Sequence, residues 1–151
     1  MQLAIDRLTK QYGQTIALDR VDLALSEGVY GLLGANGSGK TTMMRILCGI
    51  LRPTSGAVRY NDCDISGLGE SYRELLGYLP QDFGYYPDFT AYKFMLYIAS
   101  LKGLNANYAK EKSAELLEMV GLSGERNRKI KTFSGGMKQR LGIAQAMLND
   151  P

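Results

Sequence analysis

The sequence contains no histidine and no tryptophan, and it has only two cysteines among 151 residues. Cys48 and Cys63 show no metal-ligand spacing, and without histidine no mixed Cys/His zinc site can form. A disulfide framework needs more cysteines than this. We therefore interpret both cysteines as thiols that pack against neighbouring side chains.

Long apolar runs are also missing. The longest candidate, residues 94–101, covers about two helical turns, whereas a membrane span needs roughly 20 apolar residues. Near the N-terminus, Asp6 and Arg7 interrupt what would have to be the apolar core of a secretory signal. We expect a cytosolic setting and no membrane span in this chain.

The excess of charge of one sign is small. The formal net charge is +3, and the lysines and arginines are scattered along the chain. This pattern does not favour a concentrated basic face, so no nucleic acid is expected as a partner. An apolar fraction of 45% and a length of 151 residues suit one soluble domain with a core.

The first half of the sequence predicts strands around one helix. Residues 3–25 hold short apolar runs that alternate with polar residues, which predicts a small antiparallel sheet. The apolar run 29–33 predicts a strand that leads through a tight glycine-rich loop into a helix over 41–51, ending near Gly49. A further strand is predicted over 57–60.

The second half is predicted to be mainly helical. Residues 78–80 look like the end of a short strand, followed by an irregular aromatic segment over 81–89. Helices are predicted over 90–102 and 108–120. A final helix begins after Ser134 as N-cap and runs to about residue 148.

One motif lies between the predicted strand over 29–33 and the helix that follows it. It matches the P-loop pattern G-x-x-x-x-G-K-[ST] at every fixed position. A glycine-rich turn capped by a helix is the alternative, but the full match in this context favours nucleotide binding. The motif residues are Gly34, Ala35, Asn36, Gly37, Ser38, Gly39, Lys40 and Thr41.

The residue types of this loop suit a triphosphate. Glycines let the backbone wrap closely so that successive N–H groups point inward, and the following helix presents its positive end to the same anion. Lys40 is expected to reach the β and γ phosphates, and Thr41 to offer its hydroxyl to Mg²⁺. Thr42 is expected to contact the α phosphate.

A second motif indicates which family of P-loop proteins the sequence resembles. Residues 133–140, Phe-Ser-Gly-Gly-Met-Lys-Gln-Arg, resemble the LSGGQ signature of ABC-type ATPases with its K/R-Q-R continuation. Tyr12 with Gly13 resembles the adenine-stacking A-loop, and Gln81 resembles the Q-loop. Residues 149–151 resemble the lead into the Walker B strand, so the resemblance covers the whole chain.

The resemblance implies an α/β fold, a P-loop NTPase of the ABC ATPase type. An N-terminal antiparallel β subdomain with the P-loop core would occupy residues 1–80. The Q-loop and a helical subdomain would occupy 81–134, and the signature helix 134–151. The chain looks most like the ATP-binding subunit of a bacterial ABC transporter of the export type.

The same resemblance assigns roles to residues outside the P-loop. Tyr12 would stack on adenine, and Gln81 would contact Mg²⁺ or the attacking water and report the nucleotide state to a partner. Ser134, Gly135 and Gly136 would bind the γ phosphate held by a second subunit in a head-to-tail dimer. Taken alone, these residues would be a surface aromatic, a solvated amide and a helix cap.

Three positions depart from the family pattern. Ala35 stands where proline is common, Phe133 replaces leucine and Met137 replaces glutamine. None of these changes removes a phosphate ligand, but Met137 lacks the amide of glutamine.

Aromatic residues gather after the Q-loop. They occupy residues 83–89 together with Tyr92, Phe94 and Tyr97. Half of them could belong to the core, but aromatics are also typical interface anchors. In the family this region receives a membrane-spanning subunit, which would place the protein on the inner face of the cell membrane.

The family's Walker B strand ending in Asp-Glu, its D-loop and its switch histidine are expected after Pro151. We therefore expect the chain to be a piece of a longer ATPase that binds ATP but does not hydrolyse it alone. A soluble ABC ATPase of translation or repair is one alternative, although only about fifty residues separate Gln81 from Ser134, without sustained heptads. A non-catalytic nucleotide-binding fragment is the other, and the transported substrate cannot be read from the sequence.

Overall fold

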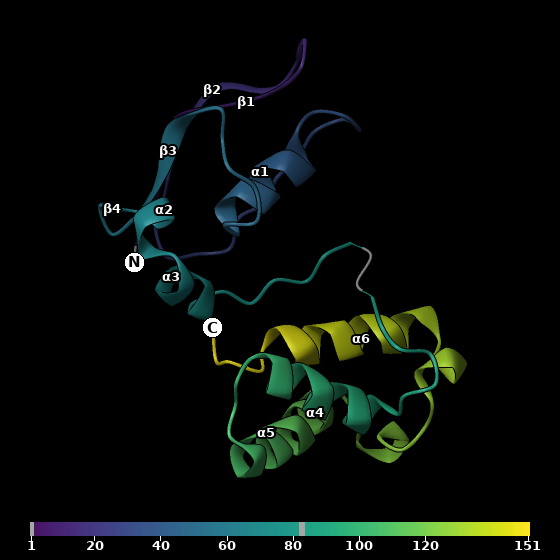
Figure 1. Cartoon of the computed structure of the whole chain (residues 1–151). Coiled ribbons are helices and arrows are strands. Elements are labelled where there is room, and N and C mark those ends of the chain that lie inside the picture. The colour runs from purple at the N-terminus through teal and green to yellow at the C-terminus, as the bar shows by residue number, and fades with distance from the viewer. Residues whose placement is uncertain (1, 82–83) are drawn as a thin grey trace. The chain divides into compact units, whose positions relative to one another are not determined.

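The computed structural model describes residues 2–81 and 84–151. The chain forms two compact units, of which the first ends at Glu74 and the second begins at Leu75 (Figure 1). The first unit contains all of the strands found in the described residues, and the second is helical. Each unit is described by itself.

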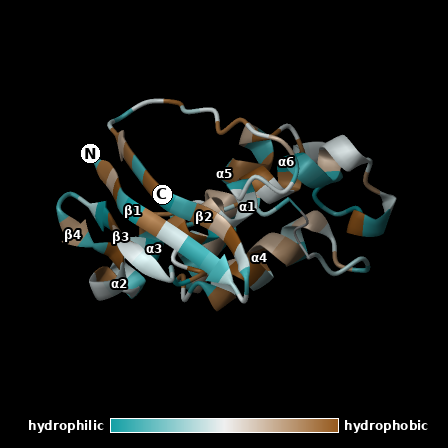
Figure 2. Ribbon diagram, turned by 90° about the horizontal axis from the view of Figure 1, so that it is seen from above, coloured by the Kyte–Doolittle hydropathy of each residue, from teal (hydrophilic) through white to brown (hydrophobic). Residues whose placement is uncertain are grey.

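The first unit is built on an antiparallel sheet with strand order β2-β1-β3-β4. The strands are β1 (Leu3–Tyr12), β2 (Thr15–Leu25), β3 (Ser55–Tyr60) and β4 (Cys63–Asp64). Apolar and polar residues alternate in brown and teal along β1 and β2 (Figure 2), as expected for strands with one buried face. The predicted antiparallel sheet is confirmed.

Helix α1 (Lys40–Leu47) packs against the buried face of this sheet. Met43 and Ile46 are its buried residues, and they join Ile5, Leu8, Leu18 and Val58 in one apolar cluster. The helix was predicted to extend to Leu51, and it ends four residues earlier, at Leu47. Gly49 adopts φ 67°, and the amide of Ile50 donates to the carbonyl of Arg45 at 2.9 Å, so a left-handed glycine closes α1.

Two short helices follow β4 and were not predicted. They are α2 (Ile65–Leu68) and α3 (Glu70–Glu74). Asp64 caps α2 by accepting hydrogen bonds from the Ser66 hydroxyl at 2.6 Å and amide at 2.8 Å. These bonds lower the pKa of Asp64, so its carboxylate is engaged in capping.

Two predicted strands are wrong. Residues 29–33 and 78–80 carry no strand, and no described residue pairs with either run. Val29 and Leu33 are almost fully exposed. A buried parallel strand needs neighbours to take its backbone hydrogen bonds, and no described strand lies beside either run.

The two cysteines differ in environment. Cys48 is partly buried at the end of α1, and this burial raises the pKa of its thiol. Cys63 in β4 is exposed. The prediction of a packing thiol therefore agrees with Cys48 and is wrong for Cys63.

The second unit contains three main helices, α4 (Ala91–Leu101), α5 (Ala106–Met119) and α6 (Gly135–Ala146). Short 3-10 turns η1 (Ser123–Glu125) and η2 (Ile130–Thr132) connect α5 to α6. The three predicted helices are confirmed within two residues at each boundary. Among the described residues, no helix is both long and apolar enough to span a membrane.

These helices share one apolar core. Its large, fully buried side chains come from α4, α5, α6, the turns between them and the segment after α6. They are Phe94, Met95, Leu116, Leu117, Leu122, Ile130, Leu141 and Leu148. Burial of this many large side chains supplies the driving force for the unit, at about 1.5–3 kcal/mol for each. Phe94 therefore belongs to the core rather than to a surface.

A polar network connects the end of the chain to α5. Asp150 accepts from the Lys112 ammonium at 2.8 Å and from the Tyr108 hydroxyl at 2.5 Å. Hydrogen bonds from Lys112 and Tyr108 lower the pKa of the Asp150 carboxyl. Because the folded protein holds this group ionised, the network stabilises the unit above the ordinary aspartate pKa of about 3.9.

The substitution Asp150→Asn tests this network. As pH falls through the lowered pKa, the wild-type chain loses the stabilisation, whereas the variant has no charge to lose. We expect the variant to be less stable at pH 7 and its stability to depend less on pH between about 5 and 3. Urea unfolding followed by circular dichroism across this range measures both effects.

Glu111→Gln is the matched control, since Glu111 is an exposed carboxylate on α5. If the control changes the pH dependence as much as Asp150→Asn does, the network is not the cause.

Candidate nucleotide site

Helix α1 begins directly after the glycine-rich loop, and its first turn has no side-chain cap. Its N-cap residue is Gly39, with φ 87° and no side-chain hydrogen bond. The first amides of a helix have no partner within the helix, and the described residues supply no side-chain oxygen that caps them here. The start of α1 therefore presents free donors and the positive end of the helix dipole.

Close contact with the backbone excludes a side chain at Gly39, where a Cβ would lie 2.3 Å from the carbonyl oxygen of Ala17. A Cβ at Gly34 would lie 2.5 Å from Ser38 Oγ, a hydroxyl that can rotate away. Gly37 adopts φ 84°, in the left-handed region. The loop backbone therefore requires Gly39, which the motif pattern fixes, and favours glycine at residue 37, which the pattern leaves open.

Lys40 turns back over the loop. Its ammonium donates to the carbonyl oxygens of Gly34 at 2.6 Å and Ala35 at 2.7 Å, and lies 3.5 Å from Ser38 Oγ. The loop thus holds a positive charge beside the free amides of α1. Thr41 is exposed in the first turn, so this set of amides, ammonium and hydroxyl fits a polyphosphate with Mg²⁺.

Tyr12 ends β1 at the turn into β2, in the same unit as the P-loop. Its side chain is 48% exposed, and the ammonium of Lys10 lies 5.2 Å from the ring centroid. An exposed ring at a turn is available for stacking on a base.

Gln81 and the start of α6 line one cavity in the second unit. The cavity measures about 510 Å³ and is bounded by Leu79, Pro80, Gln81, Tyr85, Gly135, Lys138 and Gln139. Sequence reasoning assigned Gln81 and Gly135 to different nucleotide contacts. The structure brings them to the same cavity within one chain.

Ser134 caps α6. Its hydroxyl accepts from the amide of Met137 at 3.3 Å, and Phe133 before it is buried. Met137 packs against the apolar core, which explains why this position accepts an apolar residue. The predicted N-cap is confirmed.

Sequence reasoning missed the contact between one aromatic and one basic residue beside Gln81, although it had named both in other roles. The Lys138 ammonium lies 5.1 Å from the centroid of the Tyr85 ring, and both residues line the cavity that contains Gln81. The K-Q-R sequence after the glycines marked the position of Lys138, but its contact with a ring far away in sequence could not be predicted.

An aromatic group lies at the start of α4. Tyr86 stacks on Phe89 with centroids 4.9 Å apart, and Tyr97 contacts both rings edge-on at 5.3 and 5.9 Å. The Lys93 ammonium covers Phe89 at 4.4 Å. Tyr92 packs on the helical core, and Phe83 lies outside the described residues.

Comparison with known proteins agrees with this geometry. A family described as "ABC transporter" matches residues 18–151. The chain is 42% identical to the ABC transporter ATP-binding protein YxlF of Bacillus subtilis, over 99% of this chain and 49% of that protein. It is 37% identical to the bacitracin transport ATP-binding protein BcrA of Enterococcus faecalis, over 97% of this chain and 47% of that protein.

Solved structures resemble the fold as well. An ATP-binding subunit of an ABC transporter aligns with a TM-score of 0.81 at 27% identity, covering 100% of this chain and 63% of that one. A dimeric bacterial ABC transporter cassette aligns at 0.82 and 29% identity, covering 99% and 70%. The chain spans about half the length of the curated relatives it matches.

Ser134→Ala tests whether the serine holds the start of α6. Loss of an N-cap hydroxyl costs about 1 kcal/mol of stability, and Ser134→Asn, which keeps a capping oxygen, should retain most of it. Urea unfolding followed by circular dichroism measures the difference. Equal stability of the alanine and asparagine variants would contradict the capping role.

Proposed function

Because the chain belongs to the ABC transporter family, we propose that it binds ATP with Mg²⁺ as the motor subunit of a transporter whose membrane-spanning partner moves the substrate. The observation that carries the proposal is the P-loop. Gly39 admits no Cβ, and the Lys40 ammonium turns back over the loop that leads into the uncapped start of α1.

The proposed binding rests on complementary charge. The α1 amides and the Lys40 ammonium attract the phosphates, and Thr41 offers its hydroxyl to the metal. Lys40 exchanges its carbonyl contacts with Gly34 and Ala35 for phosphate oxygens. Thr42 contacts the α phosphate, and the Tyr12 ring stacks on adenine. ATP supplies the phosphoryl group, and Mg²⁺ supplies positive charge beside it.

The second unit would act on the nucleotide of a partner subunit. We assign Ser134, Gly135 and Gly136 to contact the γ phosphate held by a second copy in a head-to-tail dimer. A Cβ at Gly135 or Gly136 would meet nothing within 4 Å, so this surface is open to an incoming anion. Apart from these in-trans contacts, Gln81 would contact Mg²⁺ or the attacking water and report the nucleotide state to a partner.

A transport role is favoured over a soluble ABC ATPase by the named relatives. They include bacitracin transport proteins and Nod factor export proteins, so we propose an export-type partner. The protein would lie in the cytoplasm against the inner face of the membrane, with the Tyr86, Phe89 and Tyr97 rings as the partner's contact.

Hydrolysis by this chain alone is not proposed. The sequence contains no histidine and no Asp-Glu pair after an apolar strand, the groups expected to position water and metal. In the complete protein, ATP binding would close the dimer and hydrolysis would reopen it. A non-catalytic nucleotide-binding fragment is the alternative for the isolated chain.

Titration with Mg²⁺ and ATP tests the binding site. We expect saturable binding that Lys40→Ala weakens at least about tenfold, because a hydrogen bond to a charged group contributes about 1.5–3 kcal/mol. Lys110→Ala, at an exposed position on α5, should leave binding unchanged. Calorimetry measures the affinity, and phosphate release measures hydrolysis, which should stay at the background of the Lys40→Ala variant.

Two results would contradict this proposal. A correctly folded sample that binds no nucleotide at millimolar concentration removes the site. Metal-dependent turnover that disappears in Lys40→Ala shows that the chain contains its own catalytic groups.

The double substitution Tyr86→Ala with Phe89→Ala tests the partner surface. It removes two stacked rings, of which Phe89 also packs against the helical core. Binding to the membrane subunit should weaken, while ATP binding at the P-loop of the first unit persists. Co-purification from membranes measures the first effect and nucleotide titration the second. Met119→Ala, at an exposed apolar position on α5, serves as the control, and equal co-purification of all forms excludes this surface.

A further inference from the structure

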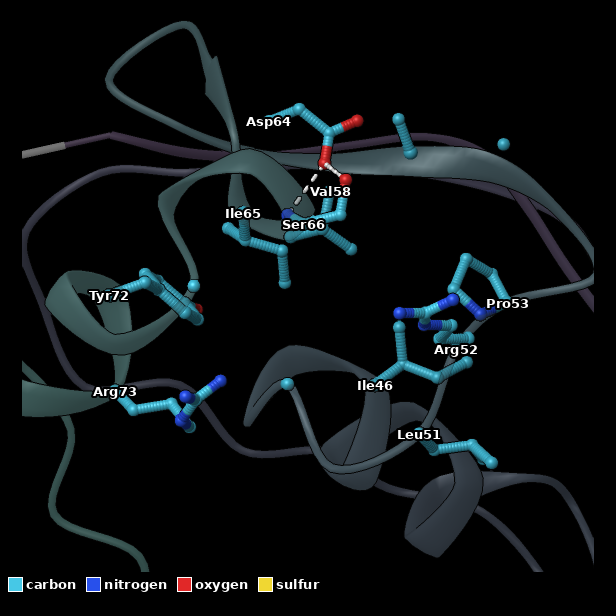
Figure 3. Close-up of a pocket in the computed structure, with 14 residues that line it drawn as sticks. Ile46, Leu51, Arg52, Pro53, Val58, Asp64, Ile65, Ser66, Tyr72 and Arg73 are labelled. Atoms are coloured by element: carbon cyan, nitrogen blue, oxygen red, sulfur yellow. Dashed lines mark hydrogen bonds between the residues drawn. The ribbon is translucent and has the colours of Figure 1, made fainter.

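A cavity of about 500 Å³ lies in the first unit, apart from the P-loop (Figure 3). It is lined by the last turn of α1, the connection through residues 49–53, strand β3 and helices α2 and α3. The P-loop lysine begins α1, whereas this cavity lies at the end where α1 stops. A volume of this size falls within the range of small-molecule sites.

One side of the cavity is apolar. Ile46 and Val58 are 1% and 2% exposed, and the partly buried Leu51 and Ile65 pack against the same cluster. Tyr72 lines the cavity, but its hydroxyl donates to the carbonyl of Leu47 at 2.7 Å. Burial raises the pKa of Tyr72 to about 12, so the ring contributes an uncharged wall.

Two guanidinium groups face the cavity from different segments. Arg52 follows α1 and Arg73 belongs to α3, and Figure 3 shows both side chains directed into the open space. The stem of Arg73 passes Gly49, where an added Cβ would lie 4.0 Å from its Cγ. Within the described part of the chain, neither guanidinium makes an ion pair or a hydrogen bond.

The acidic group on the wall does not neutralise these arginines. Asp64 accepts two hydrogen bonds from Ser66, as the cap of α2. The cavity therefore carries two positive groups against one negative group, beside an apolar surface. A guanidinium group can donate two parallel N–H hydrogen bonds to the two oxygens of a carboxylate. Two guanidinium groups therefore provide more donors than one carboxylate needs.

We propose that this cavity binds a small organic carboxylate with an apolar body. The carboxylate lies between Arg52 and Arg73, and the apolar body covers Ile46, Leu51 and Val58. Walls from five segments of one unit surround the ligand, which favours a small molecule over the side chain of a partner protein. The site needs neither ATP nor a second subunit. This proposal can therefore be tested independently of the proposed function, and either can fail without the other.

Octanoate is the probe, and methyl-labelled isoleucine observed by NMR is the readout. We expect saturable shifts at Ile46 and Ile65, with acetate and octanol each binding at least about tenfold more weakly, because acetate lacks the apolar body and octanol the charge. Arg52→Gln and Arg73→Gln should each weaken octanoate binding about tenfold. Arg45→Gln, at an exposed α1 position that does not line the cavity, should bind as the wild type does.

Four outcomes overturn the proposal. The first is that millimolar octanoate shifts neither Ile46 nor Ile65. The second is that octanoate binds the Arg52→Gln and Arg73→Gln variants as tightly as it binds the wild type. It could shift the amides of Gly37 and Gly39 instead, which would identify the P-loop as its site. A glutamate-containing tetrapeptide that binds more tightly than octanoate would identify the cavity as a protein contact.

Discussion

The close approach of Gly39 to the carbonyl of Ala17 fixes the start of α1 against β2. No side chain fits there, so the chain passes directly from the loop into the helix. This contact sets the position from which Met43 and Ile46 reach the core of the sheet. It also leaves the first amides of α1 without a cap. The packing of the first unit and the uncapped amides at the start of α1 therefore depend on the same backbone geometry.

The start of the last helix in the second unit differs from the start of α1, because it has a side-chain cap. Ser134 caps α6 through its hydroxyl, and buried Phe133 holds the preceding turn against the core. Gly135 and Gly136 leave the surface of the helix start uncovered. The cap stabilises the helix while the glycines keep it accessible, and Gln81 and Lys138 share the adjacent cavity.

Positive charge is placed at both ends of α1. Lys40 lies over the loop at its start, where the helix dipole also favours an anion. Arg52 and Arg73 face the cavity at its end, where the dipole favours cations. Arginines at that end are therefore compatible with the helix whether or not a carboxylate is bound. The two ends differ in the source of their donors. Uncapped backbone amides and the Lys40 ammonium are the donors at the P-loop, whereas arginine side chains alone are the donors at the cavity.

The sequence by itself determined the features that depend on local chemistry. Spacing, capping and turn preferences that act over a few residues predicted the P-loop glycines, the Ser134 cap and helices over 90–102 and 108–120. The structure has these helices at 91–101 and 106–119. Residues 29–33 have the composition of a buried strand, but a strand exists only where other strands complete its hydrogen bonds. The tertiary structure decided that point. It also decided that Gln81 and the start of α6 line one cavity and that Arg52 and Arg73 line another, because the placement of distant segments depends on how the core packs.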